Sequence, residues 1–219
     1  MANDIDVWRF HEGRVYDFES LKEPYVVPVI QELDYGDVKP VVIDVGAGNC
    51  SIVHSARLPF RRRNHFKTAS VDVAIPQAED NFNPNVRTDV EELVFDQAPM
   101  VRDGLLDFIA RNTSDREQFG ADLVVFSEII NYVDFKTVMS WFNQLLRPGG
   151  FMVVANLPTR GWPKLFAEKG VKSHDQMLEF VTKDLGHLIV SQAYPWEATD
   201  DYEGFMVLAT QKPDFSLAA

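Results

Sequence analysis

The stretch Val41-Val42-Ile43-Asp44-Val45-Gly46-Ala47-Gly48-Asn49-Cys50 decides the fold of this chain. Its first five residues form an apolar, β-branched run that predicts a buried strand. Two glycines follow at once, and Asn49 can cap a short helix from about Cys50 to Leu58, which Pro59 ends. A glycine turn between a buried strand and a helix N-terminus predicts a ligand site, because free backbone amides point at it. A G-x-G turn alone also fits a tight strand–helix connection that binds nothing.

Outward from this turn, strand-like apolar runs alternate with helix-period segments. The expected strands are 41–45, 68–73, 84–88, 122–127, 151–155, 188–193 and 204–210. The expected helices are 100–111, 135–146 and one that follows Ser173 and stops at Gly186. In the first, Val101, Leu105, Phe108 and Ile109 fall on one apolar face; the second has helical apolar spacing after an Asp134 cap; and Ser173 with Gln176 forms a capping-box pair for the third. The alternation predicts an α/β fold with a Rossmann-like, doubly wound sheet. The loop around Asp200-Asp201 is too short for a helical crossover, so we expect a mostly parallel sheet whose last strand is antiparallel.

Length and charge limit the possible functions. The 219 residues predict a single domain over 1–219, with an N-terminal lid segment over 1–39 and a Rossmann-like core over 40–212. The formal net charge of −12 disfavours nucleic-acid partners, so a small-molecule substrate is expected. No run approaches the roughly 20 apolar residues that span a bilayer, and no secretory signal is visible. Cys50 is the only cysteine, and we expect a cytoplasmic protein without a metal site.

Two aspartates follow later predicted strands. Asp72 closes the second strand and could accept hydrogen bonds from vicinal ribose hydroxyls. Asp89 follows the third predicted strand and could accept a hydrogen bond from an adenine amine. Each of them also fits a helix cap or a solvated loop residue. With Asp44, they place three carboxylates at successive strand ends around one glycine turn, which favours an adenosyl ligand.

At this point the sequence resembles the class I S-adenosylmethionine-dependent methyltransferases. The motifs run in that family's order: VVIDVGAGNC (41–50), TASVDVA (68–74), VRTDVEELVF (86–95), ADLVVFSEIINYVD (121–134) and LLRPGGFMVVAN (145–156). The resemblance covers residues 40 to 157, and the closing strand pair to about Lys212 also fits. It implies a seven-stranded sheet with an antiparallel final strand. It also implies S-adenosyl-L-methionine as methyl donor and S-adenosyl-L-homocysteine as product.

The resemblance also implies cofactor-binding residues. The glycine turn around the methionine part would be Asp44, Gly46, Ala47 and Gly48; the ribose would meet Asp72 and Val73; and the adenine would meet Asp89 and Val90. Ser127 and Glu128 would lie under the sulfonium, and Tyr16 of the lid would meet the methionine carboxylate. One departure is Cys50, where the family usually has a third glycine. A dinucleotide fingerprint would instead need a glycine at Ser51, which disfavours a dehydrogenase.

Methyl transfer from a sulfonium needs alignment and exclusion of water more than it needs a base. The candidate catalytic residues are His11, Glu128 and Asn131, and the residues expected to face the acceptor are Glu128, Asn131, Tyr132 and Asn156. His174 and His187 are expected to be exposed structural residues. Four aromatic residues could line a pocket for a flat or cationic acceptor, or simply pack: Trp162, Tyr194, Trp196 and Tyr202.

Other functions fit the same motifs. The domain could bind the cofactor without catalysis, as the partner of another subunit. It could also be an enzyme of the same fold with different chemistry, such as aminopropyl transfer or a nicotinamide-linked oxidation. For the assembly, both a monomer and a homodimer fit the sequence.

Overall fold

The computed structural model describes residues 39–46, 67–72, 90–94, 98–127, 129–131, 133–156, 169–196 and 204–214. The chain divides into two compact units, Met1–Phe119 and Gly120–Ala219, which are described here in turn. No helix within the described ranges is both long and apolar enough to cross a membrane. The single domain predicted from the sequence stays a prediction.

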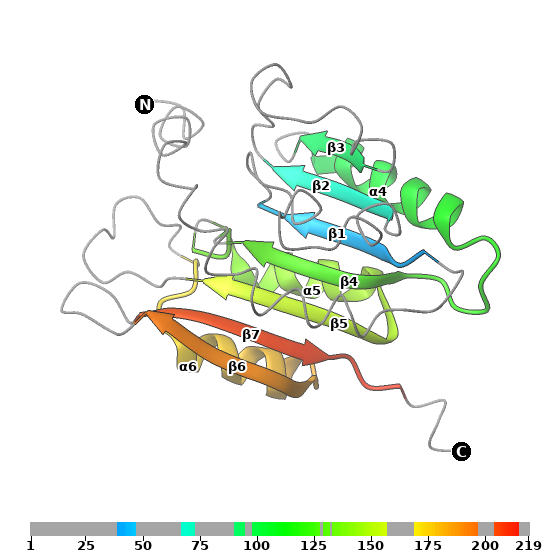
Figure 1. The fold of residues 1–219 in the computed structure, drawn as a ribbon. Helices are drawn as coiled ribbons and strands as arrows, with labels where there is room; N and C mark the ends of the chain where they lie inside the picture. The colour runs from blue at the N-terminus through cyan, green and yellow to red at the C-terminus, as the bar shows by residue number, and fades with distance from the viewer. Residues whose placement is uncertain are drawn as a thin grey trace, which may run out of the picture. The chain divides into compact units, whose positions relative to one another are not determined.

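Within its described residues, the first unit contains three parallel strands and one helix (Figure 1). The strands are β1 (Val41–Val45), β2 (Lys67–Asp72) and β3 (Val90–Val94), in the order β3-β2-β1. Every residue of β1 is buried, as its run of β-branched side chains predicts. The helix α4 (Ala98–Asn112) buries Leu105, Phe108 and Ile109, which lie on the apolar face predicted from their spacing.

The third strand differs from its prediction. We expected it over residues 84–88, but the described strand is Val90–Val94, which pairs with β2 in the register Thr68↔Val90 to Asp72↔Val94. The segment Val90-Glu91-Glu92-Leu93-Val94 supplies apolar strand residues without a proline, whereas Pro84 has no N–H for a ladder. Val90 is therefore the first residue of β3 and does not follow the strand. Val90 pairs with Thr68, and Asp72 lies at the other end of the β2–β3 ladder.

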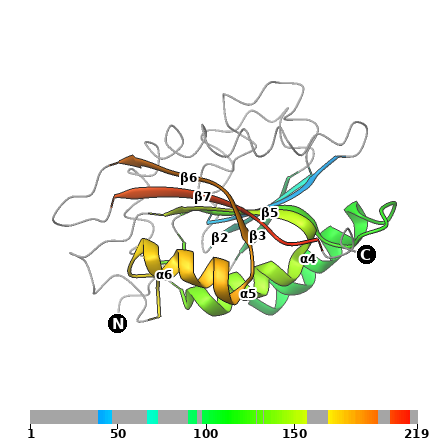
Figure 2. The ribbon, with the colours of Figure 1, turned by 90° about the horizontal axis from the view of Figure 1, so that it is seen from below.

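In the second unit, the described residues form four strands of a mixed sheet. Its strands are β4 (Ala121–Ser127), β5 (Leu146–Asn156), β6 (Leu188–Trp196) and β7 (Phe205–Gln211), in the order β4-β5-β7-β6. β4 and β5 are parallel, and β7 is antiparallel to both β5 and β6. Figure 2 shows α5 (Phe135–Leu145) and α6 (His174–Glu179) on the same face of β5 and β7.

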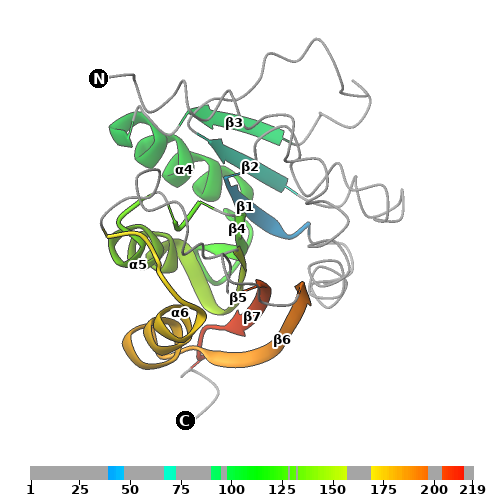
Figure 3. The same cartoon turned by 90° about the vertical axis from the view of Figure 1, so that its left-hand side faces the viewer.

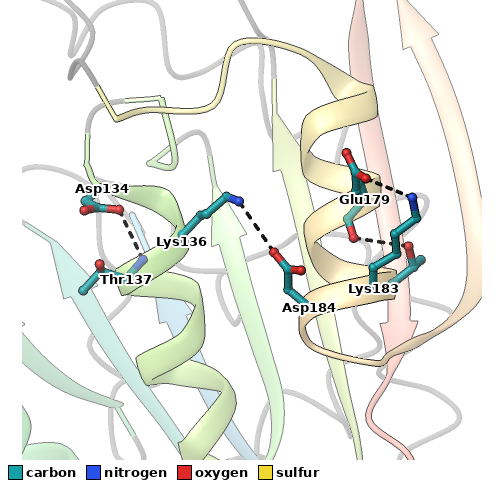
Figure 4. A network of polar contacts seen from close by, with 7 residues as sticks. Asp134, Lys136, Thr137, Glu179, Lys183 and Asp184 are labelled. Atoms are coloured by element: carbon teal, nitrogen blue, oxygen red, sulfur yellow. Dashed lines mark hydrogen bonds and ion pairs between the residues drawn. The ribbon is translucent and has the colours of Figure 1, made fainter.

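The helix α5 follows its predicted signals closely. Asp134 caps the first turn by accepting a hydrogen bond from the Thr137 amide at 3.3 Å (Figure 4). Its buried side chains are Phe135, Met139, Phe142 and Leu145. Phe142 meets Phe126 of β4 edge to face, with ring centroids 5.5 Å apart, so aromatic packing holds α5 on the sheet.

The helix after Ser173 begins as predicted but ends differently. The Ser173 hydroxyl accepts from the Gln176 backbone amide at 3.1 Å, as the expected capping box requires. The Gln176 side chain accepts from the backbone amide of Lys172 at 2.8 Å, one residue before the cap, so the second half of the box is shifted. The α-helix stops at Glu179 and continues as a π-helical turn, η4 (Phe180–Asp184), before Gly186 at φ 71°. Figure 4 shows the exposed Lys183–Glu179 and Lys136–Asp184 ion pairs on this surface, which contribute little to stability.

Candidate functional site

The glycine turn closes β1 as the sequence predicted. Asp44 is fully buried in β1, and Gly46 follows the strand at φ 75°, a conformation that favours glycine. The Gly46 amide donates a hydrogen bond to the Val71 carbonyl at 2.8 Å. The start of the turn is thereby fixed to the neighbouring strand, and a backbone without a Cβ faces the carboxyl end of β1.

Asp72 lies at the same end of the first unit. It is the last residue of β2 and directly follows Val71, whose carbonyl binds Gly46. β1 and β2 are parallel with Val45 opposite Val71, so residues 46 and 72 both continue beyond the last matched pair. In open α/β sheets this end of the strands is where ligands bind. The structure therefore brings the backbone of the predicted turn and of the predicted ribose residue together.

The corrected third strand changes the expected neighbour of the adenine. Val94, and not Val90, is the β3 residue opposite Asp72. The first carboxylate that follows Val94 in the chain is Asp96. Asp96 was not among the residues predicted from the sequence, because the strand was expected at 84–88.

In the second unit, two predicted acceptor-facing residues meet. Asn156 ends β5, Asn131 lies in the segment after β4, and the Asn156 amide donates to the Asn131 Oδ1 at 3.1 Å. Both side chains are buried. No hydrogen-bond donor from the described residues lies against the buried Asn156 Oδ1. An amide oxygen in this position can accept a hydrogen bond from a hydroxyl or an amine.

The segment between β4 and α5 is also hydrogen-bonded to the residues that precede α6. The Ile130 carbonyl accepts from the Val171 amide at 3.0 Å, and the Phe135 amide donates to the Lys169 carbonyl at 3.3 Å. The Lys169 ammonium lies 3.1 Å from the Asp134 carboxylate, which lowers the pKa of that carboxyl. Asn131 therefore sits in a segment whose backbone is bonded to the residues before α6, and its side chain is positioned by this frame.

The remaining predicted site residues have no described side chain. Outside the described residues lie His11, Tyr16, Ala47, Gly48, Val73, Asp89, Glu128, Tyr132, Trp162 and Tyr202. For Asp72, Val90, Ser127 and Trp196 only the backbone is described. Tyr194, the one member of the predicted aromatic lining with a described side chain, is 52% exposed and packs its ring on His174.

The prediction that His174 and His187 are exposed is wrong. His174 is 7% exposed, and its Nε2 lies 3.1 Å from the Gly204 carbonyl. His187 is 3% exposed, with Nε2 2.8 Å from the Asn143 Oδ1 and Nδ1 3.0 Å from the Thr210 hydroxyl. His174 was expected in the first turn of a helix and His187 just after a helix stop, both in solvent. Their burial was not visible in the sequence, because their hydrogen-bond partners lie 23 to 44 residues away.

His187 belongs to a polar cluster at the start of β5, away from the Asn131–Asn156 pair at its end. Burial, with a smaller contribution from the nearby Lys212 charge, lowers the pKa of His187 to about 4. The Lys212 ammonium donates to the Asn143 and Leu146 carbonyls at 2.8 and 2.7 Å, so a cation caps the C-terminus of α5. This cluster joins α5 and β7 beside the first residue of β5.

The described ranges contain no candidate metal site. No group of three or more His, Cys, Asp or Glu side chains there could hold a metal ion.

Several solved structures of other proteins share the fold of this chain. No protein-family model matches the chain, and no curated protein sequence matches it significantly. Among solved structures, the carbon methyltransferase CurJ matches 90% of this chain and 54% of its own, at 15% identity and a TM-score of 0.56. The chain thus spans about half the length of CurJ. The [4+2]-cyclase SpnF matches 86% of this chain and 80% of its own, at 13% identity and a TM-score of 0.56.

A third solved structure contains the demethylated cofactor. It is the geranyl diphosphate C-methyltransferase from Streptomyces coelicolor, in complex with S-adenosyl-L-homocysteine. It matches 88% of this chain and 76% of its own, at 14% identity and a TM-score of 0.53. These likenesses show that the chain has the fold of the class I S-adenosylmethionine-dependent methyltransferases.

Proposed function

We propose that this chain binds S-adenosyl-L-methionine at the carboxyl ends of β1 and β2 and methylates a small cytoplasmic molecule on oxygen or nitrogen. One observation carries the proposal. The left-handed Gly46 is hydrogen-bonded to Val71, and Asp72 follows Val71 at the end of β2. A glycine backbone and a carboxylate are the two groups that an adenosyl ligand needs at this place.

The residues of this end have distinct roles in the proposal. When bound, the cofactor supplies a methyl group activated by a sulfonium. Gly46 lets the backbone approach the methionine part, together with Ala47 and Gly48. Asp72, beside Val73, accepts hydrogen bonds from the ribose hydroxyls. Ser127, the last residue of β4, and Tyr16 complete the cofactor set that the family resemblance implies.

The acceptor side consists of Asn131 and Asn156, with Glu128 and Tyr132 beside Asn131 in the sequence. The Asn156 Oδ1 is buried, and no donor from the described residues binds it. An unmet buried acceptor costs about 1–3 kcal/mol, so a ligand donor at this position would be favoured. This supports an acceptor with a hydroxyl or amine. For a hydroxyl acceptor, His11 and Glu128 are the candidate bases.

The cofactor site is tested by calorimetry with purified protein. We expect binding of S-adenosyl-L-methionine and S-adenosyl-L-homocysteine and none of NAD. Asp72→Ala removes a carboxylate that accepts hydrogen bonds, so we expect the Kd for S-adenosyl-L-homocysteine to rise at least about tenfold. Asp103→Ala removes an exposed carboxylate from α4 and is the matched control, with unchanged affinity. Equal affinity of D72A and the parent protein would exclude Asp72 from the site.

The adenine contact has two candidates that one experiment separates. Family resemblance selects Asp89, whereas the β2–β3 register selects Asp96, the first carboxylate after Val94. We expect one of D89N and D96N, and not both, to weaken S-adenosyl-L-homocysteine binding by about tenfold, the value of one hydrogen bond to a charged acceptor. The register in which Val94 lies opposite Asp72 supports D96N as that variant. Weakening by D89N alone would show that the strand lies earlier in the chain.

A second candidate function is different chemistry on the same fold. The likeness to the cyclase SpnF supports this second candidate, because its TM-score of 0.56 equals that to CurJ. The two functions differ in product. A methyltransferase forms S-adenosyl-L-homocysteine when a panel of hydroxyl and amine acceptors is supplied, and mass spectrometry detects it together with the methylated acceptor. Cofactor binding without such a product for any acceptor would favour the second function.

A further inference from the structure

The outer strand of the second unit is unusual for the edge of a sheet. Among the described strands β6 pairs only with β7, so its other side offers unpaired backbone groups (Figure 3). Its nine residues, Leu-Ile-Val-Ser-Gln-Ala-Tyr-Pro-Trp, include no charged side chain. Soluble proteins protect a free edge with charges, prolines or bulges. β6 has Pro195 near its end and two irregularities in its pairing with β7, but no charge along Leu188–Tyr194 that would repel another strand.

The side chains of β6 are exposed as well as uncharged. Leu188 is 63%, Ile189 49%, Val190 43% and Tyr194 52% exposed. Three consecutive aliphatic residues therefore face solvent at one end of the strand. Irregularities in the pairing with β7 at Val190 and after Ala193 flank a regular run, Ser191–Ala193. An apolar run of this kind on a chain with a net charge of −12 indicates a contact surface.

We propose that a second copy of this chain pairs with it along β6. The two strands run antiparallel about a twofold axis at Gln192. In this register Val190 lies opposite Tyr194 of the second copy, Ser191 opposite Ala193, and Gln192 opposite Gln192. β-branched residues opposite aromatic residues are favourable cross-strand pairs, and the two Gln192 side chains bring no like charges together. The strand is therefore complementary to itself, as a twofold interface requires.

Charge limits the surfaces through which two copies of this chain can associate. Two chains of net charge −12 repel each other wherever charged surfaces meet. β6 is a surface where both copies are uncharged, so pairing there removes apolar side chains from water without bringing like charges together. The proposal does not depend on the proposed enzymatic function.

The first test is the mass in solution. Sedimentation equilibrium over a hundredfold range of concentration should give twice the 24.9 kDa of one chain for the parent protein. Val190→Lys and Gln192→Lys place charges in the strand pair, and Q192K places them opposite each other, so each should weaken the dimer about tenfold or more. Ser114→Lys adds the same charge at an exposed position of the first unit and should leave the dimer intact. A parent protein of single-chain mass throughout would overturn the proposal.

The second test fixes the register. In a Cys50→Ser background, which has no other cysteine, Gln192→Cys places two thiols on the twofold axis. Opposite Cα atoms in an antiparallel pair lie about 4.5–5.5 Å apart, within the range of a disulfide. Mild oxidation should therefore crosslink Q192C. Leu188→Cys would hold its thiols roughly 27 Å apart and should stay uncrosslinked. A dimer that crosslinks through L188C, or not through Q192C, would exclude this interface.

Discussion

Gly120→Ala is expected to lower the free energy of unfolding by about 4 kcal/mol, through backbone strain and overpacking together. Gly120 has φ 135°, a conformation that side chains rarely adopt. A Cβ there would lie 2.5 Å from the Arg147 amide nitrogen and 2.8 Å from the Arg147 Cα. These are backbone atoms of the irregular start of β5, so the neighbour cannot move aside as a side-chain tip could. Urea denaturation followed by circular dichroism measures the difference.

Gly186→Ala separates the two causes. Gly186 has φ 71°, but nothing lies within 4 Å of its Cβ position. Only the left-handed strain applies, so the expected loss is about 1 kcal/mol. Similar losses for G120A and G186A would show that the close approach to Arg147 has no energetic effect.

His187 is expected to make stability depend on pH in mildly acidic solution. Its pKa falls from 6.5 to about 4 on folding, because burial disfavours the charged ring. Below pH 6.5 the unfolded chain binds this proton and the folded chain does not, so the free energy of unfolding falls as the pH decreases. The contribution is intact above pH 6.5, and about 2 kcal/mol of it is lost between pH 7.5 and pH 5.

The His187→Gln variant identifies this contribution. Glutamine keeps one donor and one acceptor for Asn143 and Thr210 but does not titrate. Between pH 7.5 and pH 5, H187Q should therefore lose about 2 kcal/mol less than the parent protein. Urea unfolding at a series of pH values measures both curves. Parallel curves would mean that His187 takes up its proton equally well in the folded chain.

Local sequence signals predicted several elements well. The β-branched run before Gly46 predicted β1, and the Asp134 cap with the apolar spacing that follows predicted α5 to within one residue. These signals work because a cap, a glycine turn and helical periodicity act within a few residues. The meeting of Asn131 and Asn156 was also predictable, because the ends of neighbouring parallel strands share one edge.

The predictions of secondary structure were wrong where contacts between distant residues determine the backbone conformation. The third strand was placed too early because a short, polar segment has no strong period, and its pairing with β2 determines its position. The helix after Ser173 was predicted to be α-helical to its stop, but it becomes π-helical where Phe180 and Val181 are buried. Nothing in the spacing of residues 174–185 distinguishes these two forms.

The order of strands and helices, the start of the glycine turn after β1 and the caps of α5 and α6 follow from the amino-acid sequence alone, since each depends on neighbouring residues. The tertiary structure decided which polar side chains are buried and which strand forms an edge. His187 is buried because β7 brings Thr210 and α5 brings Asn143 to it, and β6 is exposed because β7 lies between it and β5. Burial and pairing are properties of contacts between distant segments, and these exist only once the chain has folded.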